Sequence, residues 1–171
     1  MGDGTCLFRA IAFVLYGTEM AHEKIRELLV QFVSENRGSF RPYIDGDLES
    51  YLAKMKYTRV WGTAVELLAV ASLLQIPVFT LIPHVNTYNW FCYKPLCVDR
   101  LAFPSQDPPP KQLSRLNHIE LINVRQCHYD CILSQDGDYP LDEPPLSEDI
   151  HHYTPGAAEL ADDWFQGLSQ G

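Results

Sequence analysis

Thr63-Ala64-Val65-Glu66-Leu67-Leu68-Ala69-Val70-Ala71 is the stretch that decides the fold of this 171-residue chain. Thr63 and Glu66 have the spacing of a capping box, in which each side chain bonds the backbone near the other, so a helix is predicted to begin here. The following residues are apolar on nearly every side, which is typical of a helix buried against a sheet. Residues 76–82, rich in β-formers, come next and predict a strand of that sheet.

The rest of the chain supplies further helices before this stretch and further strands after it. Apolar periodicity predicts helices at residues 6–16, 20–36 and 48–55, ended or entered at Gly17, Gly38 and Asp47. Strands are predicted at residues 90–93, 119–124 and 129–133, the last two antiparallel around a short turn at Arg125-Gln126. Helices first and strands later indicate an α+β fold, with a small, mostly antiparallel sheet backed by helices.

The composition changes after Leu133, which predicts one domain at residues 1–134 and an acidic, proline-containing tail at residues 135–171. The net charge of −9 belongs to the tail, because residues 134–171 hold nine acids and no Lys or Arg. A weak helix at residues 156–168 is expected to dock on the domain. Neither nucleic acid nor a membrane is an expected partner, since the tail is acidic and no run approaches the roughly 20 apolar residues of a membrane span.

The five cysteines suggest reduced thiols in a cytoplasmic or nuclear compartment, because the count is odd and no secretory segment is recognised. The pairs Cys92/Cys97 and Cys127/Cys131 have spacings near those of zinc ligands. However, residues four apart on a strand lie roughly 13 Å apart, so buried free thiols are the favoured interpretation. No metal or cofactor is expected.

Cys6 is the candidate nucleophile, at the end of the glycine-bearing turn Gly2-Asp3-Gly4-Thr5 and the start of a helix. The helix N-terminus favours a thiolate, and the N–H groups of such a turn can form an oxyanion hole. Asp3 is expected to brace the turn through its side chain, with a role as a second partner of an imidazole as the alternative.

His128 and Asp130 are the candidate base and orienting acid for this thiol. They are two residues apart on a predicted strand, so both side chains lie on one face and the carboxylate can orient the imidazole. The alternative is a core histidine beside a strand-end carboxylate that faces water. The residues alone therefore outline a Cys-His-Asp triad and leave this alternative open.

Three blocks then resemble a known family, the ovarian tumour (OTU) cysteine proteases. Asp3-Gly4-Thr5-Cys6-Leu7-Phe8-Arg9-Ala10 resembles its nucleophile motif, and Trp61-Gly62-Thr63-Ala64-Val65-Glu66-Leu67 resembles the start of its central helix. Ile119-Glu120-Leu121 and His128-Tyr129-Asp130 are similar to its closing hairpin. The blocks follow the family's order across residues 2–133.

The resemblance implies a monomeric deubiquitinase that cuts after the C-terminal glycine of ubiquitin without a cofactor. Cys6 is then the nucleophile, His128 the general base and acid, and Asp130 the orienting residue. The backbone of the turn from Asp3 through Gly4 and Thr5 to Cys6 would supply the oxyanion hole and contact the substrate. Trp61 and Tyr129 would line the channel for the Gly-Gly tail, although both also suit half-buried packing positions.

The chain departs from the family at three points, which keep two other functions open. It begins two residues before Asp3, it has the β-branched Thr5 where Asn or Ser is common, and it has Cys131 where Ser is common. An inactive ubiquitin-binding module is one alternative. A thiol protease for another ubiquitin-like modifier, or for a viral-type polyprotein, is the other.

Overall fold

A computed structural model of the chain describes residues 3–99, 113–124, 128–137, 139, 141, 143–146 and 150–154. Its helices are α1 (Cys6–Tyr16), η1 (Glu19–Ala21), α2 (His22–Glu35), α3 (Arg37–Phe40), η2 (Arg41–Tyr43), α4 (Leu48–Met55), α5 (Ala64–Leu74) and η3 (Leu113–Arg115). Its strands are β1 (Val78–Pro83), β2 (Tyr88–Tyr93), β3 (Ile119–Val124), β4 (His128–Cys131) and β5 (Ile150–His152). Within these described residues, no helix is long and apolar enough to cross a membrane.

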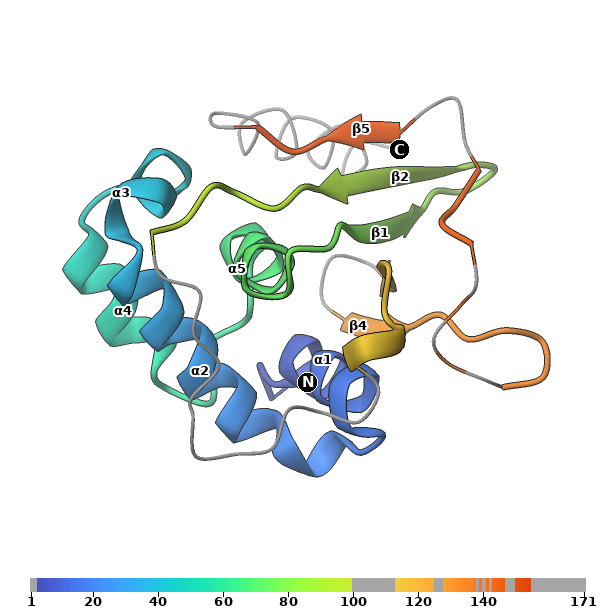
Figure 1. Cartoon of the computed structure of the whole chain (residues 1–171), viewed down its shortest axis with the longest axis horizontal. Coiled ribbons are helices and arrows are strands. Elements are labelled where there is room, and N and C mark those ends of the chain that lie inside the picture. Colours follow the sequence, from blue (N-terminus) through green and yellow to red (C-terminus); the bar gives the residue numbers. More distant parts are fainter. Residues whose placement is uncertain are drawn as a thin grey trace.

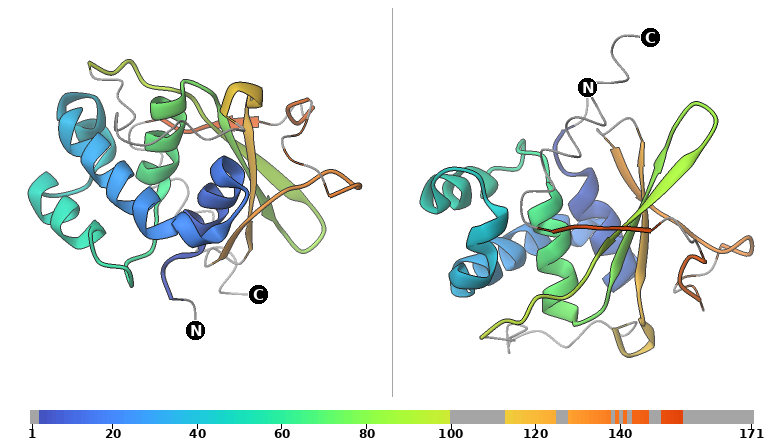
Figure 2. Two further views of the ribbon diagram at one scale, coloured as in Figure 1. Left: turned by 60° about the horizontal axis from the view of Figure 1, so that its bottom comes forward. Right: turned by 90° about the horizontal axis from the view of Figure 1, so that it is seen from above.

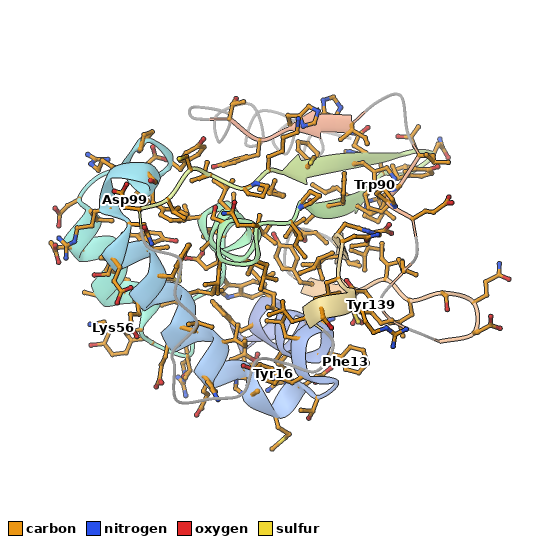
Figure 3. The ribbon with its side chains drawn as sticks, viewed as in Figure 1. Phe13, Tyr16, Lys56, Trp90, Asp99 and Tyr139 are labelled. Atoms are coloured by element: carbon orange, nitrogen blue, oxygen red, sulfur yellow. The ribbon has the colours of Figure 1, made fainter. Side chains whose placement is uncertain are left out.

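Helix α5 is the centre of the fold, as its sequence predicts (Figure 1). The capping box is formed: the Thr63 hydroxyl accepts from the N–H of Val65 at 3.2 Å, and Glu66 accepts from the N–H of Thr63 at 2.7 Å. Every residue from Val65 to Leu73 is buried. The helix packs against α2 on one side and against β1 and β2 on the other. Side chains fill the space between the helices and the sheet (Figure 3).

The five strands form one mixed sheet in the order β4-β3-β1-β2-β5. Neighbours in sequence, β1 with β2 and β3 with β4, pair antiparallel, as hairpin neighbours do. The β1–β3 and β2–β5 pairs are parallel, and each joins strands separated by a long connection. The α+β class is confirmed, and the expected mostly antiparallel sheet is instead half parallel in its pairings.

Helix ends follow local chemistry, with one correction to the expected boundaries. Gly17 ends α1 in the left-handed region, with φ of 71°, as expected. The second helix, expected over residues 20–36 with Gly38 as its stop, spans His22–Glu35 and follows the short η1. It ends at Glu35, because the side-chain amide of Asn36 donates to the carbonyl of Phe32 at 3.0 Å, and Gly38 lies inside the separate turn α3.

The sheet also uses residues that the sequence assigns to the tail. Strand β5 extends the edge of β2, and the N–H of Tyr153 donates to the carbonyl of Cys92 at 3.0 Å. The sheet thus includes a strand that lies beyond residue 134, and the division of the chain at that residue stays a prediction. The expected helix at residues 156–168 and the turn at Arg125-Gln126 lie outside the described residues.

Candidate active site

Cys6 is the first residue of α1, and the buried face of that helix anchors it. Leu7, Phe8 and Ile11 are at most 1 % exposed, so the start of the helix cannot shift without disturbing the core. Cys6 itself is partly exposed and does not form a disulfide. The helix therefore presents the thiol at its N-terminal end, where the macrodipole favours a negative charge.

Asp3 braces the turn that leads to the thiol. Its Oδ1 accepts from the N–H of Thr5 at 3.0 Å and from the Thr5 hydroxyl at 2.6 Å, and its Oδ2 accepts from Arg9 at 2.8 Å. These hydrogen bonds from Thr5, helped by the charge of Arg9, lower the pKa of the Asp3 carboxyl. The contacts are those of the expected bracing role, and they occupy both carboxylate oxygens.

Gly4 is the point at which this turn meets the loop between α4 and α5. It has a φ of +76°, and an added Cβ would lie 2.6 Å from the carbonyl carbon and oxygen of Arg59. A Cβ added at Gly62 would lie 2.5 Å from the side chain of Leu7. Backbone thus packs directly on backbone beside the nucleophile, which only glycine permits at Gly4.

Strand β4 presents two different faces beside α1. His128 and Asp130 are exposed, as expected for residues on one face, while Tyr129 and Cys131 are half-buried against the core. Helix α1 contacts β4, and both views of Figure 2 show the start of β4 beside the start of α1. The fold therefore brings the segment with His128 to the end of the helix that carries Cys6.

The bond that would orient the imidazole is not formed among the described residues. Asp130 Oδ1 accepts from the N–H of Cys131 at 2.9 Å, and no hydrogen bond joins it to His128. The carboxylate and the imidazole share a face of the strand, but the described arrangement is not a closed triad.

The two aromatic candidates for substrate contacts differ in their surroundings. Tyr129 is half-buried, and burial raises the pKa of its hydroxyl, with smaller contributions from the nearby Cys6 and Glu66. Trp61, in the loop after α4, is 36 % exposed.

The part of the chain that is described holds no cluster of metal-binding side chains. Cys92, Cys97 and Cys131 are free thiols, and no three described ligand side chains converge on a metal position. Burial and the neighbouring Asp130 raise the pKa of Cys131, which keeps that thiol protonated at neutral pH. Cys127 lies outside the described residues.

Sequence reasoning missed Arg26, which connects these parts from α2. It is 3 % exposed and donates to the carbonyl of Gly4 at 2.8 Å. Its position three and four residues before the buried Leu29 and Val30 placed it on the apolar face of α2, a signal that was available in the sequence.

A partly exposed cysteine at a helix N-terminus, next to a braced glycine turn and a histidine-bearing strand, is the arrangement of a thiol-protease site. A sequence model described as "OTU-like cysteine protease" matches residues 1–93. The chain belongs to this family.

Individual relatives agree with this assignment. The chain is 30 % identical over 112 residues to "OVARIAN TUMOR DOMAIN-containing deubiquitinating enzyme 6" of Arabidopsis thaliana, a match that covers 66 % of this chain and 20 % of the plant protein. The chain thus spans about a fifth of that relative's length.

Solved structures show the fold. "Structure of OTUD1 OTU domain" has a TM-score of 0.59 at 23 % identity, covering 78 % of this chain and 82 % of that one. "Structure of Ovarian Tumor (OTU) domain in complex with Ubiquitin" has a TM-score of 0.54 at 19 % identity, covering 80 % and 67 %.

Proposed function

We propose that this protein is a thiol-dependent deubiquitinase that hydrolyses the peptide or isopeptide bond after the C-terminal glycine of ubiquitin. The observation that carries the proposal is Cys6 at the N-terminus of α1, behind a turn braced by Asp3 and beside the start of β4. The plant relative named as a deubiquitinating enzyme and the OTU domain solved with ubiquitin support ubiquitin as the substrate.

The proposed reaction uses three side chains and no cofactor. The thiolate of Cys6 attacks the carbonyl carbon of the terminal glycine, and the resulting oxyanion is stabilised by N–H groups of the turn. The imidazolium of His128 gives a proton to the departing lysine amine, which leaves a thioester on Cys6. His128 then takes a proton from water, which hydrolyses the thioester and releases the ubiquitin carboxylate. Asp130 orients the imidazole.

The test is covalent labelling by ubiquitin that carries a C-terminal electrophile. The wild-type protein should gain the mass of one ubiquitin, Cys6→Ala should gain none, and His128→Ala should lose turnover of a ubiquitin-amide substrate. Cys131→Ser removes a second thiol near the site and should label like the wild type, because burial keeps the Cys131 thiol protonated. Labelling of Cys6→Ala would exclude Cys6 as the nucleophile.

An inactive ubiquitin-binding module is the second candidate, favoured by the bond of Asp130 to the N–H of Cys131 instead of to His128. In that case, titration would detect ubiquitin binding while the electrophilic probe forms no adduct. Parallel probes built on other ubiquitin-like modifiers would identify a different modifier as the substrate if one of them labels Cys6 faster.

A further inference from the structure

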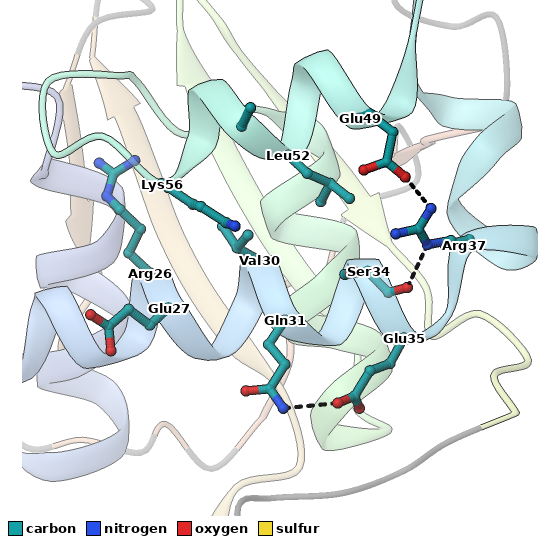
Figure 4. A pocket seen from close by; sticks show the side chains of 11 residues that line it. Arg26, Glu27, Val30, Gln31, Ser34, Glu35, Arg37, Glu49, Leu52 and Lys56 are labelled. Carbon is teal, nitrogen blue, oxygen red and sulfur yellow. Dashed lines mark hydrogen bonds and ion pairs between the residues drawn. The ribbon is translucent and has the colours of Figure 1, made fainter.

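Arg26 joins the nucleophile turn to the last residue of α4 and the loop after it through four backbone carbonyls. Its guanidinium donates to Gly4 and Val60 at 2.8 Å, to Met55 at 3.0 Å and to Thr58 at 3.2 Å. The residue lies at one end of a groove of about 620 Å³ between α2 and α4, with the guanidinium directed toward the loop that follows α4 (Figure 4). One side chain therefore holds two chain segments that meet beside Cys6.

A guanidinium suits this position because its donors lie on separate nitrogens held in one plane. Nη2 donates to Gly4, Thr58 and Val60 while Nη1 donates to Met55, whereas the ammonium of a lysine carries all its donors on one atom. The flat face of the guanidinium also lies over the ring of Phe8, 3.8 Å from the ring centroid, on the helix that carries Cys6. The stacked ring and the carbonyls together compensate the charge for its loss of water.

The carbonyl of Gly4 and the N–H of Thr5 belong to one planar peptide unit and point in opposite directions. Arg26 holds the carbonyl end at 2.8 Å, and Asp3 Oδ1 holds the N–H end at 3.0 Å. Rotation of this peptide is thus restrained from both sides. Without these restraints, Gly4 would be the residue of the turn with the greatest backbone freedom.

We propose that Arg26 is a positioning residue that sets the orientation of the Gly4–Thr5 peptide and so of the turn that receives the oxyanion. This inference rests on the proposed function. It requires attack on a carbonyl to depend on Arg26, because misplacing groups around a reacting centre by about 1 Å costs about 100-fold in rate. Alkylation of Cys6 by iodoacetamide develops no oxyanion and should not depend on Arg26.

The test compares Arg26→Lys with the control Arg41→Lys. Arg41 also donates to a backbone carbonyl, that of Ile44 at 2.8 Å, but this carbonyl is not part of the nucleophile turn. Steady-state turnover of a ubiquitin-amide substrate, alkylation of Cys6 and thermal unfolding are measured on each variant of the 171-residue chain. For Arg26→Lys we expect kcat to fall about 100-fold, with KM and the alkylation rate close to those of the wild type. For Arg41→Lys we expect all three to stay close to wild type.

Three results for Arg26→Lys would overturn the inference. These are an unchanged kcat, a higher KM with kcat unchanged, and an alkylation rate that falls by the same factor as kcat. If Arg26→Lys does not fold, Phe8→Leu replaces it, because this change removes the ring beneath the guanidinium and leaves Arg26 in place. Phe8→Leu should then lower kcat more than the alkylation rate, and equal effects would refute the inference. Inactive wild-type protein would overturn the proposed function itself, whereas active wild type with fully active Arg26→Lys refutes only the role of Arg26.

Discussion

At the scale of single residues, Gly4 combines a left-handed backbone with a neighbouring backbone at contact distance. Its φ is +76°, and an added Cβ would lie 2.6 Å from the Arg59 carbonyl. Gly46 has the same φ of +76° with nothing within 4 Å of the added atom. An alanine at Gly46 would therefore cost only the strain of left-handed backbone angles, whereas an alanine at Gly4 would add a steric clash.

We predict that Gly46→Ala lowers the free energy of unfolding by about 1 kcal/mol, the cost of left-handed angles for alanine. Gly4→Ala should lower it by about 3 kcal/mol, because the clash with backbone adds an overpacking cost. It should also abolish labelling by the ubiquitin probe, since the turn beside Cys6 must move. Urea unfolding and probe labelling measure both effects. Equal losses of stability in the two variants would contradict the proposed packing on Arg59.

Glu120 is a buried carboxyl on β3 whose ionisation should oppose folding. It is 6 % exposed, and its Oε1 lies 3.2 Å from Nε2 of His118. Burial raises the pKa of Glu120 to about 6 from 4.5, and burial lowers the pKa of His118. Between pH 4.5 and pH 6 the folded state keeps a proton that the unfolded state has released, so Glu120 makes the protein less stable as pH rises through this window. His118 has the opposite effect on stability. Burial lowers its pKa, so the folded protein loses stability as pH falls and the unfolded state takes up a proton on His118 first.

We predict that Glu120→Gln removes the contribution of Glu120 to the pH dependence of stability. The free energy of unfolding of the variant minus that of the wild type should increase by about 2 kcal/mol between pH 4 and pH 7.5. Urea titrations at several pH values measure this difference, and Glu23→Gln, on the exposed side of α2, controls for the loss of one charge. A constant difference across the pH range would rule out the raised pKa.

The positions of the candidate site residues in the fold could be predicted from sequence where the pattern is local. A cysteine at a helix start and a histidine and aspartate two apart on a strand are patterns within a few residues, and Cys6, His128 and Asp130 stand at those positions in the structure. Arg26 could not be assigned a partner, because its carbonyl acceptors lie 22 to 34 residues away. Whether Asp130 bonds His128 or the N–H of Cys131 is a choice of rotamer, which the sequence pattern does not determine.

At the scale of elements, α5 depends on its N-terminal cap. The Thr63 hydroxyl accepts from the N–H of Val65 and donates to the Glu66 carboxylate at 2.8 Å, and the Tyr51 hydroxyl donates to the other carboxylate oxygen. Burial raises the pKa of Glu66, which these bonds partly offset. The cap therefore holds both the first turn of the central helix and a buried carboxyl.

We predict that Thr63→Ala lowers the free energy of unfolding by about 1–2 kcal/mol, at the upper end for an N-cap, because the hydroxyl also satisfies buried Glu66. Thr18→Ala is the matched control: its hydroxyl caps only the short η1, through the N–H of Met20 at 3.3 Å, and a few tenths of a kcal/mol are expected. Thermal and urea unfolding measure the loss of stability in each variant relative to the wild type. A Thr63→Ala protein as stable as Thr18→Ala would show that the cap contributes little.

Helices and strands that have their own apolar periodicity or cap could be predicted from the sequence. A strand that forms only because it pairs with another strand could not. Helix α5 and strands β1 and β3 follow from capping and β-rich runs in the sequence. Strand β5 has three residues within an acidic, proline-containing stretch, and only its pairing with the edge of β2 makes it a strand. The parallel pairing of β1 with β3 likewise depends on how a long connection crosses the sheet, which periodicity does not encode.

At the scale of the whole molecule, residues after 134 complete the sheet and part of the core. Tyr153, which follows β5, stacks on Tyr43 with ring centroids 5.9 Å apart and packs on Tyr93 at 5.2 Å. Tyr139 also packs against the core. The acidic segment is thus tied to both the helical layer, through Tyr43, and the sheet, through Tyr93.

We predict that a chain ending at residue 134 is less stable than one ending at residue 154 by about 3 kcal/mol, because it loses β5 and the aromatic contacts of Tyr153. The midpoint of urea unfolding measures this difference, and Tyr153→Ala in the full chain should reproduce a large part of it. Comparison of the chain ending at 154 with the full chain tests the expected docking of a helix at residues 156–168, which would show as a further gain in stability. Equal midpoints for the chains ending at 134 and 154 would mean that the domain is complete at residue 134 and that β5 only lies on its edge.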